Sequence, residues 1–270
     1  MTARVRAYAL AAASVALPLV AAPAGVAHTN RVERGIRYAD HPECILDVRV
    51  PGGETNFPTV VWLHGGGLSG GARHFLPLAD EGIAQVAVDY RLLGKGAAGG
   101  DDCIDDAAAA VAWTLEHIAG YGGDSNRVFV AGHSAGGFLS LMVGMDPARL
   151  AAHGAANTAI AGVCAVSGQV TKHFNVRRFE GDPDPQFLPK LGSLAPLSYV
   201  SKDLPPILCV CGEPPWEWKA RAEENRFLVA SLAALGHPFA RYVECPRCDH
   251  GRVLGAALPY LEQFIRRKLP

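Results

Sequence analysis

Residues 127–145 read RVFVAGHSAGGFLSLMVGM. The first five form a short apolar run typical of a buried strand, and the last eight are typical of a buried helix. Between them lies a G-x-S-x-G motif, which strained strand-to-helix turns use to expose a serine. Gly132 and Gly136 are needed there because a Cβ in so tight a turn would collide with the neighbouring strand and helix. The stretch predicts that Ser134 lies at the head of a sheet, in front of a helix N-terminus.

A second glycine-rich stretch, HGGG at residues 64–67, follows an earlier apolar run. Three glycines let bare backbone N–H groups approach a ligand closely, as in an oxyanion hole for acyl transfer. A turn of this kind can also hold phosphate, but the continuation at residues 68–73 is LSGGAR, which matches neither G-x-G-x-x-G nor G-x-x-x-x-G-K-[ST]. The sequence favours an oxyanion hole, and a plain loop remains the alternative.

Short apolar runs alternate with longer amphipathic ones along the rest of the chain. The predicted strands are 44–50, 59–63, 84–90, 127–131, 160–166, 207–211 and 239–244. The predicted helices are 101–119, 135–145, 219–235 and 255–268. Strands that alternate with helices require crossover connections, so we expect an α/β fold with a mostly parallel central sheet and helices on both faces. No internal repeat or linker divides the chain, which indicates a single domain.

A serine nucleophile needs a general base, which is in turn held by an acid. His250 follows the last predicted strand and precedes the C-terminal helix, where a loop would carry it over the sheet edge. We expect the elbow to point His133 elsewhere and His64 to brace its own loop. The acid should follow the penultimate strand, where Glu213 is the first carboxylate and Glu217 the alternative.

The order HGGG, GHSAGG, acid and DHG resembles the α/β-hydrolases of the esterase and lipase superfamily, in particular the hormone-sensitive-lipase-like and carbohydrate-esterase-like branch. The segments VDYRL at residues 88–92 and YGGDSNRV at 121–128 are similar to that branch as well. The resemblance extends from about Cys44 to the C-terminus. It implies an α/β-hydrolase fold in residues 28–270.

The resemblance also implies roles for individual residues. Ser134 would be the nucleophile, His250 the base, and the N–H groups of Gly66, Gly67 and Ala135 the oxyanion donors. No cofactor and no metal are expected. The implied function is that of a serine carboxylic ester hydrolase working through an acyl-enzyme on a small-molecule ester.

Two departures from the family pattern qualify this function. Members commonly carry Asp or Glu at the third position after the glycine that ends the penultimate strand, and here that position is Pro215. Either Glu213 or Glu217 has taken over, or the acid is absent and the chain is a weak enzyme or an inactive binding protein. Few residues precede strand 59–63, which leaves little material for an N-terminal cap. We therefore expect short-chain or carbohydrate-type esters, with an amidase or peptidase as the alternative.

Composition sets the broader limits on function. The chain has 270 residues, 49% of them hydrophobic and 19% charged, with a formal net charge of -1, so nothing suggests nucleic-acid binding. Residues 1–27 have the pattern of a signal peptide: Arg4 and Arg6, an apolar run at 7–22, and small residues up to Ala27. That run is shorter than the roughly 20 residues of a membrane span. We expect an exported protein of unknown oligomeric state without a stable membrane span.

The remaining features leave alternatives open. Residues 169–203 are rich in proline, glycine and charge, and would form either a small cap over the site or a surface loop without a role. Of the seven cysteines, three lie in predicted strands and should be buried: Cys164, Cys209 and Cys211. Four others could pair as disulfides in an exported protein: Cys44 with Cys103, and Cys245 with Cys248.

Overall fold

The computed structural model describes residues 29–78, 82–267 and 269. The predicted signal peptide, residues 1–27, lies outside these residues, so export of the chain stays a prediction. Within the described part of the chain, no helix combines the length and the apolar character needed to cross a membrane.

Eight strands of the described chain form one twisted sheet in the order β1-β2-β4-β3-β7-β8-β9-β10. The six strands from β4 to β10 in that order are parallel, whereas β2 is antiparallel to both β1 and β4. The strands are β1 (Arg31–Arg37), β2 (Ile45–Val50), β3 (Phe57–Leu63), β4 (Ala84–Val88), β7 (Gly123–His133), β8 (Gly162–Val166), β9 (Ile207–Gly212) and β10 (Ala240–Cys245). Two short strands, β5 (Leu92–Leu93) and β6 (Gly96–Ala97), pair separately.

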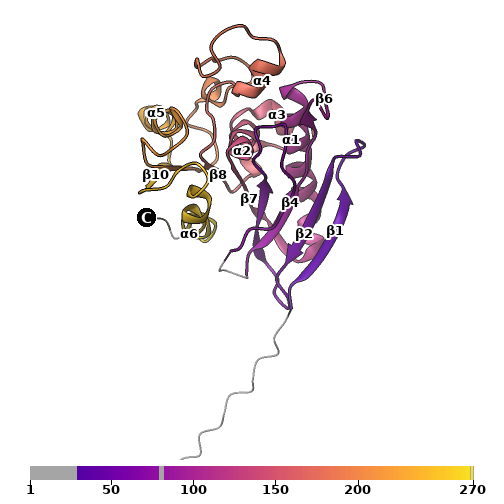
Figure 1. Cartoon of the computed structure of the whole chain (residues 1–270). Helices are drawn as coiled ribbons and strands as arrows, with labels where there is room; N and C mark the ends of the chain where they lie inside the picture. The colour runs from indigo at the N-terminus through magenta and orange to yellow at the C-terminus, as the bar shows by residue number, and fades with distance from the viewer. Residues whose placement is uncertain (1–28, 79–81, 268, 270) are drawn as a thin grey trace, which may run out of the picture.

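Helices cover both faces of the sheet (Figure 1). They are α1 (Gly100–His117), α2 (Ala135–Met145), α3 (Pro147–Ala151), α4 (Phe174–Phe179), α5 (Arg221–Ala234) and α6 (Val253–Ile265), with short 3-10 turns at 118–121, 157–159 and 196–199. One apolar core joins the sheet to α1, α2 and α5, and a second joins it to α6. Side chains alternate between the two cores along the strands β3, β7, β8 and β9, so that Val61 of β3 lies in the first and Trp62 in the second. The predicted α/β-hydrolase architecture is confirmed.

The strand β1 was not predicted from the sequence. Its residues RVERGIR are exposed except for Ile36, because β1 is the outermost strand and has only β2 as a neighbour. Charged side chains on such an edge hide the apolar alternation by which strands are recognised. The strands β3, β4, β8 and β9 are buried throughout and were all predicted, with ends that differ by a few residues.

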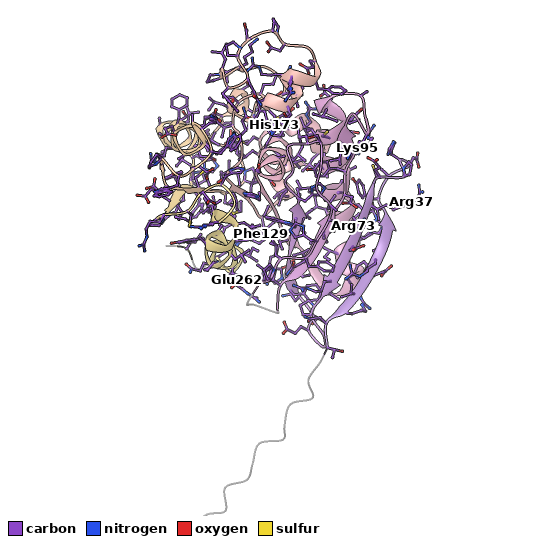
Figure 2. All side chains as sticks on the ribbon, in the orientation of Figure 1. Arg37, Arg73, Lys95, Phe129, His173 and Glu262 are labelled. Carbon is purple, nitrogen blue, oxygen red and sulfur yellow. The ribbon has the colours of Figure 1, made fainter. Side chains whose placement is uncertain are left out.

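The segment 169–203 contains α4 and folds against the domain. Figure 1 shows α4 and the loop after it projecting at one end of the molecule. Arg177 of α4 is buried and holds this loop, donating to Asp182 at 2.8 Å and to three backbone carbonyl oxygens between 185 and 188. His173, labelled in Figure 2, accepts from the backbone N–H of Asn175 and packs on Phe138 of α2. The segment is therefore a packed structure anchored on the domain.

Candidate active site

Ser134 lies in the turn between β7 and α2, as its motif predicts. Its φ angle is 58°, in the left-handed region that side chains with a Cβ seldom occupy. A Cβ on Gly132 would lie 2.3 Å from the carbonyl carbon of Gly136, and one on Gly136 would lie 1.9 Å from the carbonyl oxygen of Leu63. Both glycines are thus required by the close approach of backbone to backbone, which presents Ser134 at the carboxyl end of the central strand.

Three side chains from distant parts of the chain form a continuous hydrogen-bonded series. The Nε2 atom of His250 lies 2.8 Å from the hydroxyl oxygen of Ser134, and its Nδ1 atom lies 2.7 Å from a carboxylate oxygen of Glu217. A carboxylate can only accept, so Nδ1 carries the hydrogen and Nε2 is free to accept one from the serine. This is the geometry of a nucleophile, a base and an orienting acid.

Glu217 is buried and fully engaged. Besides His250, its carboxylate accepts from the hydroxyl of Ser167 and from the backbone N–H groups of Gly212 and Trp218. Burial by itself raises the pKa of Glu217, but these donors, His250 and Ser167 first among them, lower it to about 2. The side chain is therefore an anion at neutral pH, which favours a proton on the facing nitrogen of His250.

The preference for Glu213 as the residue facing His250 is corrected by the structure. Glu213 follows β9 directly, but its carboxylate turns away and accepts from the backbone N–H of Arg247 at 2.7 Å. The chain then makes a helical turn in which the N–H of Glu217 donates to the carbonyl of Glu213. That turn brings the second carboxylate back toward the sheet edge. The alternative residue of the sequence prediction, Glu217, is the one in contact with His250.

The glycine-rich loop passes directly beside the serine. A Cβ built on Gly65 would lie 3.5 Å from the Cβ of Ser134. Gly66 and Gly67 have φ angles of 112° and 65°, and neither N–H donates a hydrogen bond within the part of the chain that is described. Ala135 is the first residue of α2, where helical N–H groups have no partner inside the helix. The loop that carries Gly66 and Gly67 thus passes beside the serine, and none of the N–H groups of Gly66, Gly67 and Ala135 donates a hydrogen bond within the described residues.

Neighbouring side chains hold this loop in shape. His64 is buried, stacks on Tyr90, and places its Nδ1 2.7 Å from the carbonyl oxygen of Gly65. The hydroxyl of Tyr90 donates to the carbonyl of His64 at 2.8 Å. From the other side, the amide of Asn175 donates to the carbonyl of Gly67 at 2.7 Å. His64 therefore braces its own loop, as expected, and α4 of segment 169–203 contacts the loop as well.

Sequence reasoning missed Ser167 and Asn175. Ser167 directly follows β8, the strand next to β7, and a polar residue at the carboxyl end of a central strand is a usable signal for a site in a parallel sheet. Asn175 lies in a stretch without a clear period, and only the fold brings it to Gly67. The contact of His133 with His250 was not foreseen either.

An open pocket of about 670 Å³ lies beside His250. Its wall includes Trp216 and Trp218, which are 61% and 43% exposed, although tryptophan is usually well covered. Lys219, Glu223 and Asp249 add polar groups to the rim. The pocket therefore offers flat aromatic surfaces next to hydrogen-bonding groups.

All seven cysteines are free thiols in the structure, so neither pairing considered from the sequence is present. Six are buried, and burial raises the pKa of Cys209 to about 12 and that of Cys245 to about 11. Cys164, Cys209 and Cys211 lie in the buried strands β8 and β9, where they pack as small apolar side chains.

Comparison with known proteins agrees with this description. The model of the BD-FAE family matches residues 46–214, more than half of the chain. A probable isoprenylcysteine alpha-carbonyl methylesterase of Oryza sativa subsp. japonica is 34% identical over 118 residues, covering 42% of this chain and 27% of that protein. Liver carboxylesterase B-1 of Rattus norvegicus is 33% identical over 134 residues, covering 44% and 24%. The chain therefore spans about a quarter of the length of these relatives.

Solved structures show the same fold at low sequence identity. A truncated carbohydrate esterase from gut microbiota aligns with a TM-score of 0.73 at 18% identity, covering 91% of this chain and 98% of that one. Esterase 2 of Thermogutta terrifontis, solved with propionate bound, aligns with a TM-score of 0.69 at 18% identity, covering 89% and 94%.

The sheet order and the serine at its elbow define an α/β-hydrolase. Within that class, the match over residues 46–214 shows that the chain belongs to the BD-FAE family.

Proposed function

We propose that this protein is a serine carboxylic ester hydrolase that works through an acyl-enzyme. The observation that carries the proposal is the hydrogen-bonded series from Ser134 through His250 to Glu217, with contacts of 2.8 and 2.7 Å. Family membership supports it, as does the naming of the matched relatives as a methylesterase and a carboxylesterase.

In the first half of the proposed reaction, the hydroxyl oxygen of Ser134 attacks the ester carbonyl carbon and its proton passes to Nε2 of His250. The carbonyl oxygen becomes an oxyanion that accepts from the N–H groups of Gly66, Gly67 and Ala135. The anionic Glu217 stabilises the imidazolium. When the tetrahedral intermediate collapses, the bond to the alcohol breaks, and His250 returns the proton to the leaving oxygen.

In the second half, water takes the place of the alcohol. His250 removes a proton from the water, whose oxygen attacks the acyl carbon of the acyl-enzyme. The second tetrahedral intermediate is held by the same backbone donors. Its collapse breaks the bond to Ser134, the serine oxygen takes the proton back from His250, and the free carboxylic acid leaves.

For the substrate, we propose a short acyl group on a sugar or similar polyhydroxyl alcohol. The pocket of about 670 Å³ borders His250, the group that protonates the leaving alcohol, so it is suited to hold the alcohol part. Exposed Trp216 and Trp218 offer faces on which a sugar ring can stack, and Lys219 and Asp249 can hydrogen-bond its hydroxyls. The amide of Asn175 in α4 donates to the carbonyl of Gly67, so α4 lies against the glycine-rich loop, which favours a small acyl group.

The same geometry bears on the two alternative functions, an inactive binding protein and an amidase or peptidase. Pro215 stands where the acid is usual, which favours an inactive binding protein, whereas the contact of Glu217 with His250 supports an active enzyme. An amidase or peptidase would use the same three side chains. It differs in the leaving group that His250 must protonate, so only a comparison of substrates separates it from an esterase.

The decisive test is a panel of nitrophenyl acetate, butyrate and laurate, an acetylated sugar, and an anilide of a short acid. We expect hydrolysis of the acetates, a decline toward laurate, and little cleavage of the anilide. Ser134→Ala should lower kcat/KM on nitrophenyl acetate by about 10⁴-fold or more, as removal of a triad nucleophile does. Ser231→Ala in α5 is the matched control, because within the described residues the hydroxyl of Ser231 bonds only to the carbonyl of Phe227.

Three results would contradict parts of the proposal. Equal rates for wild type and Ser134→Ala would remove the serine mechanism. Faster cleavage of the anilide than of the esters would assign an amidase. Faster cleavage of laurate than of acetate would refute the short acyl group while leaving the esterase assignment intact.

A further inference from the structure

His133 occupies the variable position of the G-x-S-x-G motif, and neither the motif nor the proposed reaction gives it a task. Its side chain contacts the loop that carries the base. There its Nε2 atom lies 2.7 Å from the backbone carbonyl oxygen of His250. Residues 117 positions apart in the chain are thus joined within the site.

The direction of this hydrogen bond is fixed by its acceptor. A carbonyl oxygen cannot donate, so the hydrogen belongs to Nε2 of His133. The ring lies beside that of His250, with 4.9 Å between centroids and 39° between planes, and its other nitrogen faces the glycine-rich loop at Gly65. His133 therefore lies where the elbow, the base loop and the oxyanion loop meet.

The charge of His133 suits this place. Burial, with the neighbouring His250 as the next cause, lowers the pKa of His133 to about 4. The ring is neutral at neutral pH and donates its hydrogen bond without adding a positive charge beside His250. A cation there would oppose the imidazolium that the proposed reaction forms.

Several hydrogen bonds hold the base loop, residues 246–252, and two sets of them lie next to the carbonyl of His250. Glu217 holds the imidazole of His250 through Nδ1, and Asp249 accepts from the backbone N–H groups of Gly251 and Arg252 at 3.0 and 2.8 Å. Neither contact fixes the carbonyl of His250 itself. The bond from His133 does so, and its other end is on the residue next to the nucleophile.

We infer that His133 is a positioning residue of the active site: its Nε2 hydrogen bond to the carbonyl of His250 sets the base at the right distance from Ser134. The inference rests on the proposed function. Without this bond, the peptide after His250 can rotate, and the imidazole shares the movement because it is attached to the same backbone. The serine then loses its proton acceptor in part of the population.

The test is the rate at which a fluorophosphonate probe labels Ser134, measured with kcat and KM for nitrophenyl acetate. His133→Phe keeps a ring and removes the donor, and His133→Asn keeps a donor too short to reach the carbonyl. Both should label about tenfold more slowly than wild type, the effect of roughly one hydrogen bond, with kcat lowered and KM within about twofold. His133→Gln can place its Nε2 near the original donor and should label within about threefold of wild type.

The outcomes separate this inference from the proposed function. If wild type itself is not labelled at Ser134, the proposed function fails. If wild type is labelled and both His133→Phe and His133→Asn match it, the positioning role is refuted and the esterase stands. A Gln variant as slow as Phe also refutes it, since ring packing would then be the cause. Thermal unfolding of each variant identifies one that is slow only because it is misfolded.

Discussion

The nucleophile elbow, residues 132–137, and the acid turn, residues 212–217, serve the same imidazole but are held in place by different means. In the elbow, backbone lies against backbone: a Cβ on Gly136 would lie 1.9 Å from the carbonyl oxygen of Leu63. In the acid turn, the position of Glu217 depends on partners far along the chain, including Ser167, 50 residues away, and His250, 33 residues away.

The difference explains which part of the site was predictable. The elbow requires glycine for steric reasons, so its six consecutive residues can be recognised from the sequence alone. The sequence does not decide between the two carboxylates, Glu213 and Glu217, because both are compatible with a turn after β9. Gly212 places the start of that turn, since its Cβ would lie 2.3 Å from the carbonyl oxygen of Cys248. The tertiary contacts then select Glu217.

The largest expected effect compares the two carboxylates. Glu217→Gln should lower kcat/KM for nitrophenyl acetate by about 10³–10⁴-fold, as loss of the orienting acid does in other triads. Glu213→Gln should leave the rate within about threefold, because the amide oxygen of glutamine can still accept from the backbone N–H of Arg247 and the change touches neither His250 nor Ser134. Steady-state kinetics of both variants at one pH measure the contrast.

The pair is a matched control because both changes are isosteric and lie in the same turn. Equal losses would mean that the contact between Glu217 and His250 does not decide the activity. A larger loss for Glu213→Gln would restore the original sequence preference and contradict the geometry of the acid turn.

The fold was predictable to the extent that local pattern and burial coincide. The strands β3, β4, β8 and β9 are buried along their length, and apolar runs revealed all four. The edge strand β1 is exposed to solvent and carries charged side chains, so it lacks the apolar run by which the buried strands were recognised. In the site, Ser134 and His250 could be placed because Ser134 directly follows β7 and His250 lies in the loop after β10. Glu217 and Asn175 depend on contacts that form only after the segments around them have folded.

The second expected effect is on stability: the contribution of Glu217 in the acid turn to the free energy of unfolding should depend on pH. The pKa of Glu217 in the folded protein is about 2, against an ordinary value of 4.5. Its ionised form therefore stabilises the fold fully above about pH 4.5, and this stabilisation is lost as the pH falls toward 2. The difference between these two pKa values corresponds to about 3 kcal/mol of unfolding free energy, at about 1.4 kcal/mol for each pKa unit.

Urea unfolding of wild type and Glu217→Gln between pH 3 and 7 measures this contribution. The difference in unfolding free energy between the two proteins should be constant at the upper end and should shrink below about pH 4.5. A difference that stays the same down to pH 3 would contradict the fully hydrogen-bonded carboxylate described for the acid turn. Glu213→Gln, measured in parallel, gives the effect of removing a carboxylate from the same turn without touching His250.

The smallest expected effect tests the elbow through two glycines that both lie in helices. Gly136→Ala places a methyl group against the backbone of Leu63, which cannot move without disturbing β3, so we expect a loss of about 1–3 kcal/mol in unfolding free energy. Gly255→Ala in α6 has no atom within 4 Å of the added methyl and should gain about 0.5–1 kcal/mol, because alanine favours the helix. Denaturant unfolding at neutral pH measures both. If the two variants changed stability in the same direction, helix propensity rather than backbone contact would govern position 136, and the elbow would be no more rigidly specified than the acid turn.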